Sequence, residues 1–316
     1  MIDQYLDFEQ PIAEIESKII ELQNSESLAE EQVKSELIKL NESAVRLTEK
    51  IYSKLSPWQQ VQVARHPSRP HFADYVRNIT DSFDELHGDR KFGDDRAIVG
   101  GIATLGNYNV MLIGHEKGRS TDEKIQHNFG MSQPEGYRKA YRLMKLAERF
   151  KLPVVTLIDT PGAYPGIESE ERGQSEAIAN NLRMMSSLET PIIVNIVGEG
   201  GSGGALALGV GDHISMMQYA TYSVASPEAC ASIVWRDSSR APEAAEAMKL
   251  NAENLLEINL IDEIIKEPLG GAHRNPEQSS HSLKTSIVDN LEKLLNSPTE
   301  RLIEKRYDRL MSYGSI

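Results

Sequence analysis

The stretch Pro191-Ile-Ile-Val-Asn-Ile-Val197 runs directly into Gly198-Glu-Gly-Gly-Ser-Gly-Gly-Ala205. An apolar run rich in β-branched residues that ends in glycines is typical of a buried parallel strand, a tight turn and the start of a helix. Small residues at helical spacing continue through Leu206 and Leu208. Because the first N–H groups of a helix have no intrahelical partner, they favour negative charge opposite them. The stretch therefore predicts an α/β protein with an anion-binding site at the carboxyl end of this strand.

Three kinds of chemistry fit this glycine cluster. Gly198-x-Gly200-x-x-Gly203 matches the dinucleotide fingerprint, although no acidic residue ends the apolar strands that follow. Gly200-x-Ser202-x-Gly204 matches a nucleophile elbow, and Asp262 and His273 follow in the order that a serine hydrolase needs. In the third interpretation the glycines expose backbone N–H groups that bind an oxyanion, as in enolate chemistry on thioesters. A phosphate-binding P-loop is excluded because no Gly-Lys-Ser/Thr follows the loop.

Length and composition indicate a globular protein with a full core. The chain has 316 residues, of which 40% are hydrophobic and 26% charged. A single cysteine, Cys230, excludes an intrachain disulfide and a multi-cysteine zinc site. The sequence shows no secretory leader and no apolar run long enough for a membrane span, so we expect a cytoplasmic protein without a membrane partner. The formal net charge of -13 argues against a nucleic-acid partner.

Two local clusters of basic residues occur within this acidic chain. Each could receive an anionic group or an acidic partner, although for the second cluster a solvated helix face is the interpretation that we favour. The clusters are Lys117, Arg119 and Lys124, followed by Arg138, Lys139, Arg142, Lys145 and Arg149.

Apolar residues at helical spacing, and then at heptad spacing, predict an αα-hairpin over residues 8–55. So narrow an apolar stripe seldom forms a core alone. We expect it to pack either on the main domain or on another chain. The expected organisation is a helical hairpin over 1–60, a main domain over 61–296 and a C-terminal helix over 297–316.

Strands and helices alternate through the main domain. Two apolar runs separated by Gly106-Asn107 predict a β-hairpin. The strand 153–158, which ends in a glycine-bearing turn, resembles the strand at 191–197, and we expect both turns to open at one edge of the sheet. The remaining predicted strands are 213–217, 222–225 and 260–265. Helices are predicted over residues 72–86, 174–187, 241–250 and 297–311. Two more begin at Pro134 and near Ser226, and another contains Leu283 and Leu294. The inner face of the helix from Pro134 is expected to consist of Tyr137, Ala140, Tyr141, Met144 and Ala147.

Several long motifs, in order along nearly the whole chain, resemble the alpha subunit of the bacterial and plastid multisubunit acetyl-CoA carboxylase carboxyltransferase. The motifs are Leu6-Asp-Phe-Glu-Gln-Pro-Ile12, Asp159-Thr-Pro-Gly-Ala-Tyr-Pro-Gly166, Glu171-Arg-Gly-Gln-Ser175, Gly198 to Ala205, Ser226-Pro-Glu228 and Glu267-Pro-Leu-Gly-Gly-Ala-His-Arg274.

This resemblance implies a crotonase-like fold of the ClpP/crotonase type, a spiral of strand-strand-helix units, here with the N-terminal αα-hairpin. It implies an α2β2 carboxyltransferase that moves the carboxyl group of carboxybiotin to acetyl-CoA, giving malonyl-CoA for fatty acid synthesis. Biotin would arrive on a separate biotin carboxyl carrier protein that biotin carboxylase loads, and acetyl-CoA would bind the beta subunit. Zinc is expected in the beta subunit, and no metal is expected in this chain.

The implied mechanism needs no side-chain base. Carboxybiotin releases CO2, and the biotin enolate that remains takes a proton from acetyl-CoA, so the enzyme must hold a negative oxygen. The resemblance assigns the oxyanion hole to the N–H groups of Gly203 and Gly204. Gly200 and Gly201 are expected to shape the turn. Gly162 and Ala163 are expected to line the shared cleft.

The tripeptide Ala247-Met-Lys249 resembles the biotinylation site of carrier proteins, which lies at a hairpin tip between strands. Helix-forming residues surround it here, so we expect Lys249 to be a solvated helical lysine.

Overall fold

The computed structural model describes residues 5–24 and 30–314. The helices are α1 (Gln10–Gln23), α2 (Glu30–Tyr52), α3 (Pro57–Ala64), α4 (Phe72–Ile79), α5 (Thr121–Gln126), α6 (Pro134–Phe150), α7 (Ile167–Glu171), α8 (Gln174–Ser187), α9 (Ser202–Leu206), α10 (Pro227–Trp235), α11 (Ala241–Met248), α12 (Ala252–Glu257), α13 (Pro276–Leu295) and α14 (Thr299–Ser312). The strands are β1 (Ser82–Glu85), β2 (Ile98–Leu105), β3 (Tyr108–His115), β4 (Val154–Thr160), β5 (Ile192–Gly201), β6 (His213–Met217), β7 (Thr221–Ser223) and β8 (Glu263–Ile265). Short 3₁₀ helices cover Asp7–Glu9, Asn128–Gly130 and Ser238–Arg240.

One mixed sheet organises the chain, with strand order β1-β2-β3-β4-β5-β6-β8 and β7 paired to β5. The first three strands are antiparallel, and the pairs from β3 onward are parallel. Gly106, with φ of +57°, makes the predicted turn between β2 and β3. All residues of β4 and β5 are buried, which explains their continuous apolar sequence. Because β4 and β5 are parallel, their glycine-bearing turns open at the same edge, as predicted.

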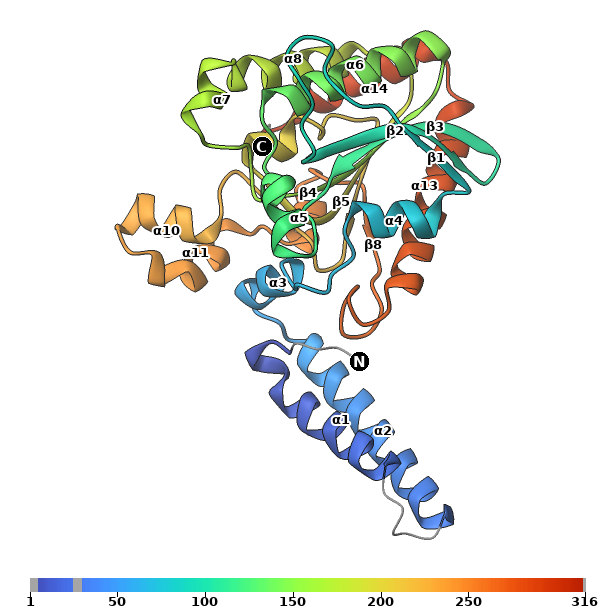
Figure 1. Ribbon diagram of the computed structural model, residues 1–316, viewed down its shortest axis with the longest axis vertical. Helices are drawn as coiled ribbons and strands as arrows, with labels where there is room; N and C mark the ends of the chain where they lie inside the picture. The colour runs from blue at the N-terminus through green and yellow to red at the C-terminus, as the bar shows by residue number, and fades with distance from the viewer. Residues whose placement is uncertain (1–4, 25–29, 315–316) are drawn as a thin grey trace.

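Helices α6 and α8 lie on one side of the sheet and α4 lies on the other (Figure 1). The inner face of α6 differs from the prediction at one position. Tyr141 is 38% exposed, whereas Leu143 is fully buried and faces Gly100 of β2. Tyr141 and Leu143 both lie near the apolar face of the helix, and the position of β2 determines that Leu143 is the one that is buried.

The predicted helix over residues 72–86 is wrong in its second half. Helix α4 ends at Ile79, and Thr80 has extended backbone angles. The segment from Ser82 continues as the edge strand β1, antiparallel to β2. Phe83 then meets Phe72 edge to face, with ring centroids 6.1 Å apart. Pairing with β2 therefore overrides the local helical pattern.

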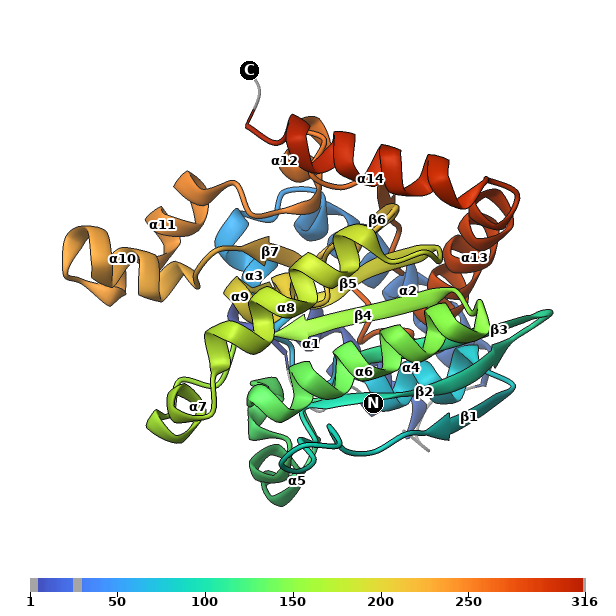
Figure 2. The same cartoon turned by 90° about the horizontal axis from the view of Figure 1, so that it is seen from above.

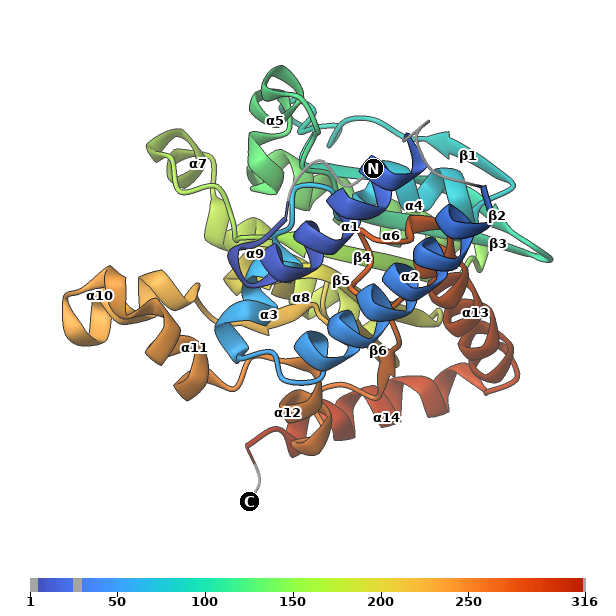
Figure 3. The same cartoon turned by 90° about the horizontal axis from the view of Figure 1, so that it is seen from below.

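The predicted αα-hairpin is present as α1 and α2, and it projects away from the sheet (Figure 1). Figure 3 views the molecule from the side on which the hairpin lies nearest. Its base packs on the body, where Ile12 and Tyr52 form a buried cluster with Val63 and Tyr219. The far part exposes apolar side chains, including Ile38 at 54%. The intramolecular contact is thus confirmed for the base of the hairpin, and Arg274 of the body also pairs with Glu16 in the middle of α1, at 2.8 Å.

Helices α10 and α11 form a second projection, seen at the left of Figure 2. Lys249 follows α11 with φ of +50° and is exposed. It lies at the end of a helix and not at a hairpin tip between strands, so the tertiary setting of a carrier lysine is absent. Among the described residues, no helix combines the length and apolarity that a membrane span requires.

The polar C-terminal helix α14 is anchored by one buried ion pair. The Arg306 side chain is fully buried and donates from Nε and Nη2 to the carboxylate of Asp212, at 3.0 and 2.7 Å. Its remaining donors reach the carbonyl oxygens of Met185, Leu188 and Thr190. Asp212 also accepts a hydrogen bond from the backbone of Ile192 at the start of β5. The contact therefore joins α14 to α8 and to the central strand.

We expect Arg306→Leu to destabilise the protein by about 3–5 kcal/mol, because it leaves the Asp212 carboxylate buried and unpaired. Arg301→Leu on the same helix changes the same charge at an exposed position and should have little effect. Urea unfolding followed by circular dichroism measures both. Equal unfolding midpoints for the two variants would contradict the anchoring role.

Candidate functional site

The carboxyl ends of β4 and β5 bring the two glycine turns into backbone contact. A Cβ added to Gly204 would lie 2.6 Å from the carbonyl carbon of Gly162 and 2.8 Å from the nitrogen of Ala163. Real side chains do not tolerate such distances, so only glycine permits this approach. The structure thus brings together three of the residues that the sequence proposed for one site.

The expected role of Gly200 and Gly201 in shaping the turn stays a prediction, and the structure places both residues at the end of strand β5, with Gly201 as the N-cap of α9. Strand β5 continues through Gly201, and its last residues pair with β7 in parallel register. The left-handed residue of the turn is Ser202, with φ of +50°. Gly201 is required for a further reason, because its Cβ would lie 2.2 Å from the carbonyl oxygen of Pro161. The pairing with β7 extends the strand beyond the point where the apolar sequence ends.

Helix α9 is shorter than its sequence pattern and ends at Leu206. The dipole of a helix is the sum of its peptide dipoles, so a helix of five residues produces only a small part of the positive potential that the sequence pattern predicts at its N-terminus. What remains are the N–H groups of Gly203 and Gly204, which lie in the first turn and have no intrahelical acceptor. Individual N–H groups, more than a helix dipole, are therefore what this edge offers to an anion.

An apolar cavity of about 250 Å³ adjoins Gly203. A Cβ on Gly203 would lie 3.5 Å from Ile178 of α8, an ordinary contact distance. The cavity combines a glycine backbone with an apolar wall on the side of β7. Its wall is made by Ser202, Leu206, Tyr222, Ser223, Val224 and Leu260.

Buried polar residues end the neighbouring strands at the same edge. The nitrogen of Lys117 lies 2.5 Å from Asp159 of β4, and the same Asp159 oxygen accepts a hydrogen bond from the backbone N–H of Glu199 in β5. His115 ends β3 and is 1% exposed. Burial lowers the pKa of His115 to about 4, against the opposing effects of Asp159 and the backbone of Gly204. The imidazole is therefore neutral near pH 7.

An ion-pair network fixes the outer side of this edge. Arg65 joins β5 to α10, with 2.6 Å to Glu199 and 2.6 Å to Glu228. The buried Arg69 pairs with Glu267 at 2.7 Å and donates to the carbonyl oxygen of Val197. These contacts hold α3, α10 and the loop after β8 around the end of β5.

Sequence reasoning missed His115 and Asp159 as parts of this edge and treated Lys117 only as part of a basic cluster. The sequence did contain a signal for these residues, because the apolar runs of β3 and β4 are each followed by an ionisable residue, His115 and Asp159. The carboxyl ends of parallel strands meet at one edge, so such residues become neighbours.

The serine-hydrolase alternative lacks its geometry. Asp262 pairs with Arg309 at 2.7 Å and accepts from the backbone of Ile214. His273 stacks on His66, with ring centroids 3.8 Å apart. Among the described residues, no hydrogen bond links either of them to Ser202.

Among the described residues, one cluster of side chains brings together atoms of the kind that bind metal ions. Glu9, His66 and His273 are buried, and one ligand atom from each lies within 4.8 Å of the others. The two imidazole rings are stacked with an interplanar angle of 14°, so their in-plane lone pairs run side by side and do not converge. Such a stack does not offer the converging donors of a metal centre. The expectation of no metal in this chain stays a prediction.

The neutral state of His115 gives a pH-dependent term in stability. The unfolded histidine binds a proton below about pH 6.5, whereas the folded one does so only below about pH 4. Stability from this residue is therefore lost as the pH falls through that window, by about 3 kcal/mol in all. We expect His115→Phe to flatten the pH dependence of the free energy of unfolding between pH 4 and 6.5, measured by urea titration.

His281→Phe, at an exposed position of α13, is the matched control and should keep the wild-type slope. A His115→Phe slope equal to that of the wild type would contradict the buried neutral imidazole.

Comparison with known proteins assigns the chain to one family. The family described as acetyl co-enzyme A carboxylase carboxyltransferase-like matches residues 5–314. The acetyl-coenzyme A carboxylase carboxyl transferase subunit alpha of Photobacterium profundum is 59% identical over 313 residues, covering 98% of each chain. That of Alcanivorax borkumensis is 56% identical over 316 residues, covering 100% of this chain and 98% of the relative.

Solved structures support the fold. A transcarboxylase 12S structure matches with a TM-score of 0.59 at 19% identity, covering 72% of this chain and 42% of that one. A Pseudomonas malonate decarboxylase hetero-tetramer matches with a TM-score of 0.59 at 15% identity, covering 76% and 94%. These likenesses confirm the predicted crotonase-like α/β fold. The full-length match shows that this chain belongs to the acetyl co-enzyme A carboxylase carboxyltransferase-like family.

Proposed function

We propose that this chain is the alpha subunit of an acetyl-CoA carboxylase carboxyltransferase, and that it binds carboxybiotin at the joined ends of β4 and β5. Carboxyl transfer to acetyl-CoA gives malonyl-CoA. The observation that carries the proposal is the backbone contact of Gly204 with Gly162 and Ala163, in a chain that belongs to this family over its full length.

The residues at this edge suit the biotin group. A ureido oxygen needs hydrogen-bond donors, and the N–H groups of Gly203 and Gly204 have no intrahelical acceptor. The thioether ring and its chain are apolar, and Leu206, Tyr222 and Val224 wall the adjoining cavity. When bound, carboxybiotin supplies both the carboxyl group and the base for the acyl-CoA.

The task of this chain is then to bind, orient and stabilise negative charge. Each preorganised N–H donor at an oxyanion contributes about 3 kcal/mol to lowering the barrier. Asp159 orients the end of β5 by accepting from the N–H of Glu199, and Lys117 neutralises the buried carboxylate. Neutral His115 adds no charge that would compete for the anion.

The second half of the site belongs to the proposed beta partner in an α2β2 assembly. This chain offers one cysteine and no acyl-CoA site that the sequence identifies, which is consistent with acetyl-CoA and zinc on the partner. The biotin carboxyl carrier protein and biotin carboxylase complete the proposed set of partners, and the cytoplasm is the proposed location.

Malonyl-CoA decarboxylation with free biotin as acceptor tests this assignment. We expect no activity from this chain alone or from the beta chain alone, and activity from their mixture, because each chain would hold one of the two substrates. Size-exclusion chromatography of the mixture verifies that the complex has formed. Activity from this chain by itself, or none from a verified complex, would sink the split-site proposal.

The glycine contact gives a sharper test in the mixed complex. We expect Gly204→Ala to lower the rate of malonyl-CoA decarboxylation by about 10²–10³-fold, because its Cβ would collide with Gly162 and Ala163 and displace a donor. Gly203→Ala should retain most of the rate, since its Cβ meets only Ile178 at 3.5 Å.

Ser202→Gly is the control for nucleophilic catalysis. It removes the hydroxyl group while keeping a residue suited to a φ of +50°. Retained activity is expected. Loss of activity in Ser202→Gly, with Gly204→Ala unaffected, would favour a serine nucleophile over the backbone site.

A further inference from the structure

A cavity of about 600 Å³ lies between the loop at Asp89–Lys91 and helices α6 and α8. Its volume falls in the range of small-molecule sites, about 300–1,000 Å³. None of its lining residues belongs to the proposed carboxybiotin site. Basic side chains outnumber the acidic ones in the wall, where Asp89 and Glu176 are the acidic residues and the basic ones are Arg90, Lys91, Arg138, Arg142 and Lys145.

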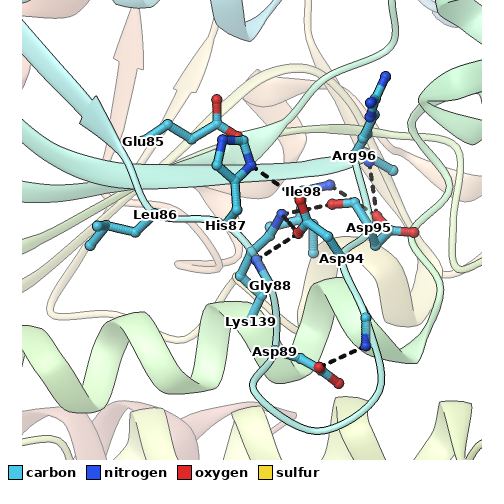
Figure 4. A network of polar contacts seen from close by, with 12 residues as sticks. Glu85, Leu86, His87, Gly88, Asp89, Asp94, Asp95, Arg96, Ile98 and Lys139 are labelled. Carbon is cyan, nitrogen blue, oxygen red and sulfur yellow. Dashed lines mark hydrogen bonds and ion pairs between the residues drawn. The ribbon is translucent and has the colours of Figure 1, made fainter.

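The carboxylates of the adjacent loop are engaged in hydrogen bonds and ion pairs with neighbouring residues (Figure 4). One oxygen of Asp89 accepts backbone hydrogen bonds from Lys91, Phe92 and Gly93, and the other pairs with Arg138 at 2.9 Å. These contacts hold the pKa of Asp89 below its usual range, even though burial opposes that shift. Asp89 is therefore committed to shaping the loop.

Asp94 and Asp95 are committed in the same way. Asp94 receives Lys139 at 2.6 Å and the backbone N–H of Gly88 (Figure 4). Asp95 accepts from the backbone of Ala97 and of Gln133. Lys139 departs from the expectation of a solvated helix face, because its side chain is only 1% exposed, whereas Lys145 and Arg149 of the same cluster are exposed.

Two guanidinium groups remain without a carboxylate. Arg142 donates to the carbonyl oxygens of Leu86, His87 and Gly88, and Arg90 donates to that of His87. In the described chain neither of them forms an ion pair with an acidic side chain. The pKa of Arg142 is lowered by burial first and then by the nearby charge of Arg90, against the opposing charges of Asp94 and Asp89.

This arrangement places two positive charges side by side at the loop, with Arg90 exposed and Arg142 half-buried. Like charges repel, and the carbonyl contacts fix Arg142 beside Arg90. Two other cations of the wall are compensated, since Arg138 pairs with Glu135 and Lys145 with Glu148, whereas Lys91 forms no ion pair among the described residues. An anion between Arg90 and Arg142 would relieve the repulsion.

We propose that this cavity binds a small ligand that carries a diphosphate group, held by Arg90 and Arg142. Guanidinium groups match phosphate oxygens bidentately. The hydrogen bonds from Arg142 to the loop use Nε and Nη2, so its Nη1 is the nitrogen that would face the ligand. Lys91 adds positive charge at the rim, and Tyr141 and Asn180 add an aromatic face and an amide, which suit the base of a nucleotide.

Isothermal titration of the full-length chain with inorganic pyrophosphate, and separately with ADP, tests the proposal at low ionic strength. We expect both probes to bind, and ADP to bind more tightly if the ring contacts Tyr141. Arg142→Gln and Arg90→Gln should each weaken pyrophosphate binding by about tenfold or more, since a charge-assisted hydrogen bond contributes about 1.5–3 kcal/mol.

Arg149→Gln is the matched control, because it removes the same charge from the same helix outside the cavity. It should bind pyrophosphate as the wild type does. If Arg142→Gln does not fold, Lys91→Gln provides the test, because Lys91 is exposed. Lys91→Gln should weaken pyrophosphate binding without changing the midpoint of unfolding.

Two results would overturn the proposal. One is the absence of pyrophosphate binding to the folded wild-type chain. The other is an equal loss of binding in Arg149→Gln and in the cavity variants, which would indicate a general effect of net charge. Neither result depends on carboxyltransferase activity, so this proposal and the carboxybiotin proposal fail independently.

Discussion

The constraint on which the site depends is the close approach of two backbones at the carboxyl ends of β4 and β5. Parallel pairing of the two strands sets their turns side by side, and the pairing of Thr160 with Gly200 across a register shift continues the contact to the end of β4. Gly204 then lies against Gly162 and Ala163 at a distance that excludes any side chain. The proposed carboxybiotin site, in which the N–H groups of Gly203 and Gly204 would bind one anion, depends on keeping this contact.

Buried charge surrounds this contact and holds it. Asp159 bonds to the backbone of β5, Lys117 neutralises Asp159, and Arg65 and Arg69 bind the same end of β5 from outside. Burying such groups is favourable only when they are paired and hydrogen-bonded, so each ion pair fixes a geometry as well as a charge. The glycine edge can therefore remain polar yet rigid. The cavity beside α6 differs, because there the loop acids are used internally and two guanidinium groups are left over.

The same fold separates two kinds of anion recognition. At the strand ends the proposed donors are neutral backbone N–H groups, which suit charge that develops during a reaction. Beside α6 the proposed donors are permanent cations, which suit a ligand that is always charged. Binding at the strand ends depends on the fixed positions of N–H groups, whereas binding beside α6 depends on Coulomb attraction. Added salt should therefore weaken binding more beside α6 than at the strand ends.

The sequence by itself determined the parallel core, the αα-hairpin and the glycines of the site, because continuous apolar runs, heptad spacing and glycine clusters each reflect local backbone demands. Its errors occurred where a distant partner decides. Residues 82–85 are a strand because β2 offers an edge, and Tyr141 is exposed because β2 selects Leu143. The pairing of Gly200 and Gly201 with β7, which extends β5, is likewise decided by a distant partner. Only the tertiary structure placed His115 and Asp159 beside the glycines and left Arg90 and Arg142 without carboxylates. A sequence pattern reports local periodicity, whereas such charge pairing depends on side chains brought together from separate elements.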